Sequence, residues 1–389
     1  VEDVFINGRS GVLMSINGKT GKVIWEFLPG YSAEQARNEG WYNFYNPQFV
    51  KDVDNDGVKD IVISSGGDHK IEAFDPNRPI GLIVLISGKT GKLISRAEVP
   101  DGKETYMSVV AWKVGDKTNL LIGTGGETIP GALYVTTVQD ILNGDLSNSI
   151  KIAESAVKGF IAPPVLADIT NDGVLDIVVI AVDGRMIAIN GSTMQTQWST
   201  GIFGTEAFAS LAVGRFDADY IPDFFTTVNT GIWPEMEYAL SLVVDGMSGK
   251  IVKSDTVGYY QMVSPIAVDI DNNGYDEILL HTNFPQRDAE VGKTKYSNTL
   301  FLFDFRNKMV QRFGPIFQGA KQASTPWIGD LDGDGFLDVI MLYQKDIYNE
   351  SIFGGIEIMR MDVGIRMQRP VVWGAYMGSY YDGVYRDNK

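Results

Sequence analysis

Apolar and polar positions along the chain follow one recurring pattern. A short apolar stretch, often with a proline, leads into an acidic loop, and a run of β-branched residues follows directly. Over residues 160–202 this pattern predicts four short strands, at 160–167, 177–182, 186–190 and 196–200. Helical periodicity is nearly absent, and 33–39 and 138–143 are the only short candidates. The sequence therefore predicts an all-β chain.

The acidic loops mark an internal repeat. Strong copies begin at Asp52, Asp168, Asp269 and Asp330, and weaker copies begin at Arg215 and Ala111. The starts, at 52, 111, 168, 215, 269 and 330, lie 47 to 61 residues apart. Four-stranded units that recur at such a period are typical of a β-propeller.

The two ends of the chain supply one more unit. Residues 3–25 align with residues 176–198, so the chain begins at the second strand of a unit, and residues 371–385 resemble a first strand with a decayed loop. We therefore expect residues 1–389 to form a single domain, a seven-bladed β-propeller of four-stranded blades. Its seventh blade would be shared by residues 1–27 and 371–389, and the C-terminal strand would close the ring by pairing with the N-terminal strands. A stack of two β-sandwiches is the alternative, but it would need neither the period nor complementary ends.

Composition excludes several classes of function. The chain has 33 basic and 49 acidic residues and a formal charge of −16, which argues against binding to nucleic acid or to anionic lipid. No apolar run approaches the roughly 18 residues that a membrane-spanning helix needs. The absence of cysteine excludes disulfides, thiolate metal sites and cysteine nucleophiles. The two histidines, His69 and His281, exclude a three-histidine zinc site.

The spacing of the acidic loops points to a metal ion. Asp-x-Asp-x-Asp-Gly-x-x-Asp places side-chain oxygens at positions 1, 3, 5 and 9, and Ca²⁺ takes six to eight oxygen ligands of this kind. An EF-hand loop would need glutamate at position 12 and flanking helices, whereas here a strand follows position 9. The alternative is that the aspartates only cap backbone amides, as in Asx-turns. Repulsion among three or four acidic groups in each loop favours the ion.

These loops resemble the FG-GAP or VCBS-type repeats of integrin α-subunit-like propellers, which carry such a loop between the first two strands of a blade. The resemblance implies about four Ca²⁺ ions. The implied ligands are Asp52, Asp54, Asp56 and Asp60; Asp168, Thr170, Asp172 and Asp176; Asp269, Asp271, Asn273 and Glu277; and Asp330, Asp332, Asp334 and Asp338.

Other features depart from this pattern. Arg215 could itself satisfy Asp217 and Asp223, which would make that loop metal-free, and the loop at Ala111 has lost nearly all ligands. The Thr-Gly-Lys turns at 20–22 and 90–92 also resemble those of quinoprotein-type propellers, a local likeness that implies no bound quinone.

The sequence contains no catalytic constellation that we can identify. Neither Gly-x-Ser-x-Gly nor a P-loop is present, and the paired carboxylates belong to the metal loops. We therefore expect calcium to have a structural role and the chain to be non-enzymatic. Because loops of this kind can need millimolar calcium, the pattern favours an extracytoplasmic location, which is periplasmic, cell-surface or secreted.

Aromatic residues in two inserts suggest a partner surface. They are Tyr31, Trp41, Tyr42, Phe44 and Tyr45 in the insert 28–46 and Trp233 in the insert 229–238. The alternative is that these side chains only cover the core. The sequence thus favours a protein-recognition or scaffold subunit of an extracytoplasmic or envelope assembly, with a protein partner. A carbohydrate-active propeller, either a polysaccharide lyase or a lectin, is the second hypothesis.

Overall fold

The computed structural model describes residues 3–7, 11–28, 42–68, 71–72, 74–259, 262–319, 324–344, 346–348 and 356–386. Within this part the chain is almost entirely β, which confirms the predicted class. It forms two compact units, Val1–Pro163 and Pro164–Lys389. One short helix, α2 (Val138–Leu142), confirms the candidate at 138–143, while the candidate at 33–39 lies outside the described residues.

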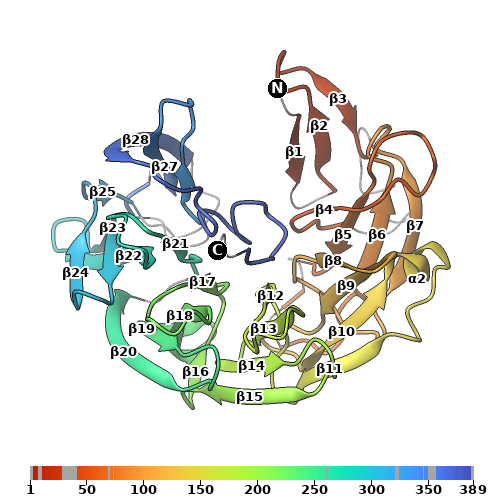
Figure 1. The fold of residues 1–389 in the computed structure, drawn as a ribbon, viewed down its shortest axis with the longest axis horizontal. Helices are drawn as coiled ribbons and strands as arrows, with labels where there is room; N and C mark the ends of the chain where they lie inside the picture. The colour runs from red at the N-terminus through yellow and green to blue at the C-terminus, as the bar shows by residue number, and fades with distance from the viewer. Residues whose placement is uncertain are drawn as a thin grey trace. The chain divides into compact units, whose positions relative to one another are not determined.

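The first unit contains three antiparallel sheets in the described residues (Figure 1). The first sheet has the order β1-β2-β3, with β1 (Val4–Asn7), β2 (Leu13–Ile16) and β3 (Val23–Glu26). The second comprises β4 (Gln48–Phe49), β5 (Ile61–Ser65), β6 (Leu82–Ile86) and β7 (Leu93–Glu98). The third comprises β8 (Val110–Val114), β9 (Lys117–Gly123), β10 (Gly131–Thr137) and β11 (Ile150–Ser155).

The second unit contains four further antiparallel sheets in the described residues. The first comprises β12 (Val165–Ala167), β13 (Asp176–Ile180), β14 (Arg185–Ile189) and β15 (Thr196–Gly201). The next comprises β16 (Thr205–Glu206), β17 (Ala212–Gly214), β18 (Asp223–Ile232), β19 (Glu235–Val244) and β20 (Ile251–Tyr259). The third comprises β21 (Ile266–Val268), β22 (Glu277–Asp288), β23 (Lys293–Asp304), β24 (Met309–Arg312) and β25 (Phe317–Gln318). The last comprises β26 (Trp327–Gly329), β27 (Phe336–Gln344) and β28 (Ile356–Arg366).

The strands predicted over 160–202 are present with small shifts. The second, third and fourth lie within two residues of their predicted bounds, as β13, β14 and β15. The first strand begins at Val165 rather than at residue 160. Pro163 and Pro164 explain the difference, because proline has no N–H to donate to a neighbouring strand.

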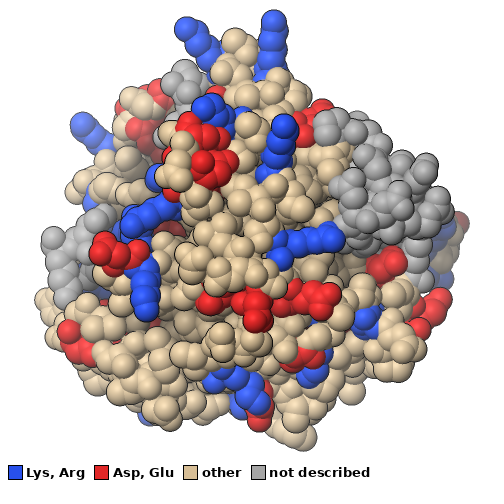
Figure 2. Space-filling model, turned by 90° about the vertical axis from the view of Figure 1, so that its right-hand side faces the viewer, with Lys and Arg blue, Asp and Glu red and all other residues tan. Residues whose placement is uncertain are grey.

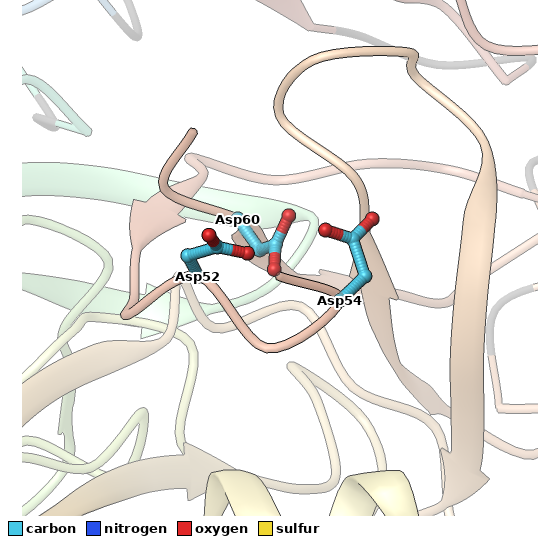
Figure 3. A group of neighbouring side chains, drawn as sticks. All are labelled: Asp52, Asp54 and Asp60. Carbon is cyan, nitrogen blue, oxygen red and sulfur yellow. The ribbon is translucent and has the colours of Figure 1, made fainter. Parts of the chain in front are cut away.

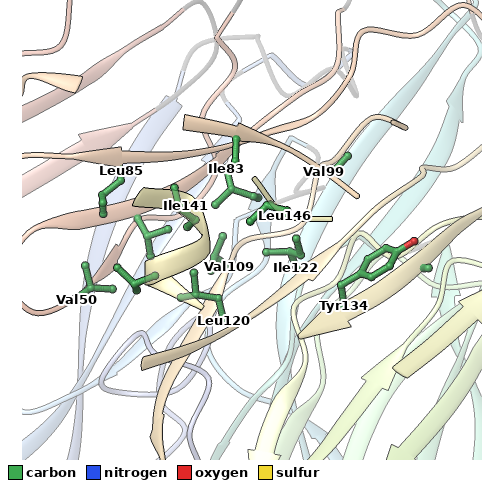
Figure 4. Packing of buried hydrophobic residues seen from close by; sticks show 14 residues of the cluster. Val50, Ile83, Leu85, Val99, Val109, Leu120, Ile122, Tyr134, Ile141 and Leu146 are labelled. Atoms are coloured by element: carbon green, nitrogen blue, oxygen red, sulfur yellow. The ribbon is translucent and has the colours of Figure 1, made fainter. Parts of the chain in front are cut away.

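Packing between the sheets is apolar. In the first unit, Ile83 and Leu85 of β6 pack with Leu120 and Ile122 of β9, and all four side chains are almost fully buried (Figure 4). Ile141 of α2 joins this cluster. Strands such as β5 and β6 are buried over almost their whole length, as expected for strands covered on both faces by neighbouring sheets.

Two tryptophans connect neighbouring sheets by the same geometry. Trp25 of β3 donates its indole N–H to the carbonyl oxygen of Gly88 at 2.9 Å, in the turn that joins β6 to β7. Trp198 of β15 donates to Gly246 at 2.9 Å, in the turn that joins β19 to β20. The ring of Trp25 lies against Gly91, where an added Cβ would come within 2.3 Å of it. Each tryptophan therefore docks one sheet onto a turn of the next.

The C-terminal segment lies along the first strands of the second unit. Val384 forms a bridge with Leu166 of β12, and Trp373 forms one with Ala267 of β21. Ile328 of β26 donates its N–H to the carbonyl oxygen of Gly374 at 2.8 Å. The Trp373 indole also donates to the Leu211 carbonyl, next to β17, at 3.2 Å. Strands β12, β21 and β26, and Leu211 just before β17, thus face one segment, as the inner strands of a propeller do.

These observations are consistent with a β-propeller: seven antiparallel sheets follow one another along the described chain. The ring closure and the single domain over residues 1–389 concern how the two units are arranged, and both stay predictions. The C-terminal strand expected within 371–389 is not formed over the described residues 371–386, which make only isolated bridges to Leu166 and Ala267 because the segment follows a series of turns. On the face shown in Figure 2, basic side chains are interspersed with acidic ones and form no continuous basic surface.

Candidate metal-binding loops

The strong acidic loops share one hydrogen-bond frame. We name them the Asp52 loop (52–60), the Asp168 loop (168–176), the Asp269 loop (269–277) and the Asp330 loop (330–338). In the Asp52 loop, the carboxylate at position 1 accepts the backbone N–H of Asp56 at 3.1 Å and of Gly57 at 2.8 Å. The other loops repeat both bonds at 2.9 to 3.1 Å. These bonds fold each loop back on its first residue.

Backbone conformation explains the residue types at positions 4 and 6. In the Asp52 loop, Asn55 has φ 60° and Gly57 has φ 90°, and both values lie in the left-handed region. Asparagine and glycine enter this region at low cost. The sequence pattern around the aspartates is therefore required by the turn as well as by the carboxylates.

Position 9 connects the Asp52 and Asp168 loops, and the loop that begins at Arg215, to a second turn. Asp60 is fully buried, and its Oδ2 accepts the N–H of Val53 at 2.7 Å while its Oδ1 accepts that of Gly88 at 3.1 Å. The Gly88 carbonyl oxygen also accepts the Trp25 indole N–H, so this one residue links the acidic loop to the tryptophan contact. Asp176 and Asp223 make the equivalent bonds to Gly191 and Gly246.

Three loops gather carboxylates closely enough to share one ion. Asp52, Asp54 and Asp60 point toward one another in Figure 3, and each offers an oxygen within 4.8 Å of the others. The remaining triads are Asp269, Asp271 and Glu277, and Asp330, Asp332 and Asp338. All three triads use positions 1, 3 and 9, while position 5 (Asp56, Asn273 or Asp334) accepts the N–H of position 7.

The Asp168 loop differs at position 3. Thr170 stands there and donates its hydroxyl to Asp176 at 3.2 Å, so positions 1, 3 and 9 hold two carboxylates instead of three. Among the described residues this loop forms no three-carboxylate group. Its hydrogen-bond frame is nevertheless the same, with Asp172 accepting the N–H of Val174 at 2.8 Å.

The Arg215 loop (215–223) brings together a triad that sequence reasoning missed. Asp217, Asp219 and Asp245 each offer an oxygen within 4.8 Å of the others. The Arg215 guanidinium lies over the rings of Tyr220 and Tyr275, at 4.5 and 5.4 Å from their centroids, rather than in a described ion pair with Asp217 or Asp223. Asp245 could have indicated this triad in the sequence, because it is an acidic residue at the start of the turn between the third and fourth strands.

The loop at Ala111, which has lost nearly all ligands, is a tight turn. Val114 of β8 pairs directly with Lys117 of β9, so only Gly115 and Asp116 connect the two strands. The acidic loop has been replaced by a hairpin.

Crowded carboxylates hold their protons more tightly than usual. Burial and the neighbouring Asp271 and Asp269 raise the pKa of Glu277 to about 8. Burial, with Asp217 and Asp219 nearby, likewise raises the pKa of Asp223 to about 8. In the Asp52 loop, desolvation and the charges of Asp60 and Asp56 raise the pKa of Asp54. A bound cation would relieve this repulsion.

Arginines already contact two of the loops. Arg360 of β28 donates from Nε to Asp338 Oδ1 at 2.8 Å and from Nη2 to Asp332 Oδ2 at 2.5 Å. The guanidinium of Arg369 lies 2.6 Å from Asp269 Oδ2. No described ion pair involves the triad of the Asp52 loop. The loops thus differ in how their negative charge is balanced.

The raised pKa values predict a pH dependence of stability. Glu277 and Asp223 bind protons in the folded chain up to about pH 8, whereas in the unfolded chain they release them near their ordinary values. Between these limits the folded state binds more protons, so in EDTA the free energy of unfolding should fall as pH rises from about 5 to about 8. With saturating calcium the fall should be smaller, because the ion replaces the proton. Urea unfolding at several pH values checks this, and equal slopes with and without calcium would contradict it.

The predicted partner residues are placed differently from one another. Tyr31 and Trp41, with His69, lie outside the described residues. Tyr42 and Phe44 are 1% and 3% exposed and pack in the core of the first unit, so their rings do not form a surface. Tyr45 is half-buried against Tyr106, and Trp233 is half-buried against Phe208. For Tyr42 and Phe44, the alternative holds: their side chains belong to the core.

None of the described helices has the length and apolar character needed to span a bilayer.

Comparisons with known proteins show the fold. No protein-family model matches this sequence, and no curated protein sequence matches it either. Among solved structures, a europium-containing methanol dehydrogenase is similar with a TM-score of 0.56 at 11% identity, covering 88% of this chain and 71% of that chain. A quinohemoprotein alcohol dehydrogenase from Comamonas testosteroni has a TM-score of 0.47 at 11% identity, with 95% and 74% covered. The quinohemoprotein alcohol dehydrogenase ADHIIG from Pseudomonas putida HK5 has a TM-score of 0.47 at 12% identity, with 88% and 61% covered.

These findings correct two expectations. The assignment to FG-GAP or VCBS repeats of the integrin type is wrong, because the fold is similar to that of a methanol dehydrogenase. The predicted scaffold function and its alternatives, a lyase or a lectin, are contradicted by the same comparison. The physical reason is that an acidic loop between two strands is a local device. It specifies a turn rich in carboxylates, and it does not by itself identify the family of the fold that carries it.

Proposed function

We propose that this chain is a calcium-binding β-propeller in which ions held by the acidic loops stabilise the blades. One observation carries the proposal. In three separate loops, the carboxylates at positions 1, 3 and 9 lie within 4.8 Å of one another on the same hydrogen-bond frame. Three such charges cost free energy when they are held together without a cation.

Calcium fits these loops better than other common ions. The donors are side-chain oxygens of Asp, Glu, Asn and Thr, which suit a cation with six to eight oxygen ligands at about 2.3 to 2.6 Å. Mg²⁺ would demand a stricter octahedron and retain water. The ligands we propose are those of the Asp52, Asp168, Asp269 and Asp330 loops given above, for about four ions. The triad of Asp217, Asp219 and Asp245 is a separate acidic group of the same kind.

The location and the finer architecture form part of the same proposal. Loops of this type bind calcium at concentrations found outside the cytoplasm, which supports an extracytoplasmic chain. Seven blades are supported by the seven antiparallel sheets that follow one another along the described chain, and the sharing of the seventh blade by residues 1–27 and 371–389 is supported by the aligned ends of the sequence alone.

Metal analysis of a single-site variant tests the calcium proposal. Asp54→Asn removes one carboxylate of the Asp52 triad and should lower the calcium bound at equilibrium dialysis by one ion per chain. Asp116→Asn is the matched control, since it removes the same charge from the hairpin turn between β8 and β9. The stoichiometry should not change in this control. An Asp54→Asn variant that binds as much calcium as the unaltered chain would refute the assignment.

Alcohol oxidation is a second candidate, favoured by the fold shared with a methanol dehydrogenase. That protein contains europium, and carboxylate triads suit a hard trivalent cation as well as calcium. Turnover of short alcohols with an artificial electron acceptor, in the presence of calcium or a lanthanide, would establish the activity. The absence of any turnover above a protein-free control would leave calcium binding as the proposed function.

A further inference from the structure

Arg360 occupies an unusual position in its sheet. It pairs with Ile340 of β27, two residues after Asp338. Four other sheets carry a nine-residue loop before the corresponding strand. In them, the residue two positions after position 9 pairs on the next strand with Leu85, Ala188, Val243 or Leu302. All four are buried apolar residues. The last sheet alone among these five therefore places a cation beside its acidic loop at this position.

The guanidinium contacts two of the three triad members. Nε and Nη2 donate to the two oxygens of Asp338 at 2.8 and 3.1 Å, and Nη2 also donates to Asp332 Oδ2 at 2.5 Å. Asp338 Oδ2 accepts the N–H of Leu331 as well. Two parallel hydrogen bonds from a planar guanidinium to the two oxygens of one carboxylate form a directional and well-matched pair, called a fork. Positions 3 and 9, which an ion needs, are thus already engaged by an internal cation.

The Asp52 loop offers the contrast. Its triad accepts backbone N–H groups, and Lys89 donates instead to the carbonyl oxygen of Asp56 at 2.7 Å. Asp60 has its two described bonds from backbone amides and none from a guanidinium. The two loops have the same frame and the same four aspartates, at positions 1, 3, 5 and 9. They differ in the partner at position 9, which is the Gly88 N–H at Asp60 and the Arg360 guanidinium at Asp338.

We propose that Arg360 is an internal counter-cation that competes with calcium for the Asp330 loop and makes it a weaker site than the Asp52 loop. The inference rests on the proposed calcium function. For an ion to enter the Asp330 loop, the guanidinium must leave at least Asp332. The loop therefore stays folded at low calcium, where the arginine balances its charge, and it takes an ion only at higher concentration.

Calcium titration of the full chain tests this assignment. Arg360→Gln should move one site from the weak class to the tight class, with a gain in affinity of up to about fivefold, the size expected for a partly exposed ion pair. Arg360→Lys keeps the charge without the fork and should lie between the two. Arg312→Gln removes an equal charge from an exposed position on β24 and should change nothing. Adding Asp332→Asn to Arg360→Gln should abolish the gain.

Thermal unfolding gives an independent readout. In EDTA, Arg360→Gln should melt below the unaltered chain, because the Asp330 triad loses its counter-cation, and calcium should raise its Tm by more than it raises that of the unaltered chain. An Arg360→Gln chain that binds calcium as the unaltered chain does would overturn the inference. An equal change in calcium affinity or Tm in Arg312→Gln would also overturn the inference, because it would reflect net charge alone. If neither the unaltered chain nor the variants bind calcium, the proposed function itself fails.

Discussion

Removal of calcium with EDTA should lower the Tm of this chain by about 10 °C or more. Each ion present at 100 times its dissociation constant adds about 2.7 kcal/mol to the free energy of unfolding, and several loops contribute. The effect is large because each acidic loop leads directly into a second strand, and in the Asp52 and Asp168 loops the position 9 carboxylate also anchors a second turn. Differential scanning calorimetry with and without calcium measures it.

Two controls make the chelation result specific. Adding back calcium should restore the Tm fully, while an equal concentration of magnesium should restore it only in part, because Mg²⁺ fits a flexible oxygen site less well. If exhaustive chelation leaves the melting curve unchanged, calcium does not contribute to the stability of the fold.

Trp25→Ala should lower the free energy of unfolding by about 3 to 5 kcal/mol, as expected for removal of a large buried ring. Trp25 is 8% exposed, donates to Gly88 at 2.9 Å and lies against Gly91 of the neighbouring sheet. Trp25→Phe keeps most of the apolar contact and loses the hydrogen bond, so its effect should be smaller.

The control for this substitution is the adjacent Ile24, which is 48% exposed on the same strand. Urea unfolding of Ile24→Ala should show a loss well below that of Trp25→Ala. Equal losses in the two variants would mean that the tryptophan contact between the sheets contributes nothing specific.

Much of the fold could be predicted from the sequence because the same strand and loop pattern recurs several times along the chain. The β-branched runs after the acidic loops became β5, β13, β22 and β27. The pairing of the C-terminal segment with Leu166 and Ala267 could not be predicted. It depends on contacts between residues more than 100 positions apart, for which a local pattern gives no signal.

The candidate site was predictable wherever one loop supplies all the ligands. Asp52, Asp54 and Asp60 lie within nine residues, and their spacing alone indicated a shared ion. The group at Asp217 was missed because Asp245 comes from another turn, and Arg360 was missed because it lies on a neighbouring strand. Tyr42 and Phe44 were misplaced for the converse reason: aromatic residues in an insert can fold back into the core as well as face solvent.

A crystal structure of the chain grown in calcium tests the central claim most directly. The account predicts an ion in the Asp52 loop, with carboxylate oxygens of Asp52, Asp54 and Asp60 at about 2.3 to 2.6 Å from it. A loop that at millimolar calcium holds only water between these carboxylates would contradict it.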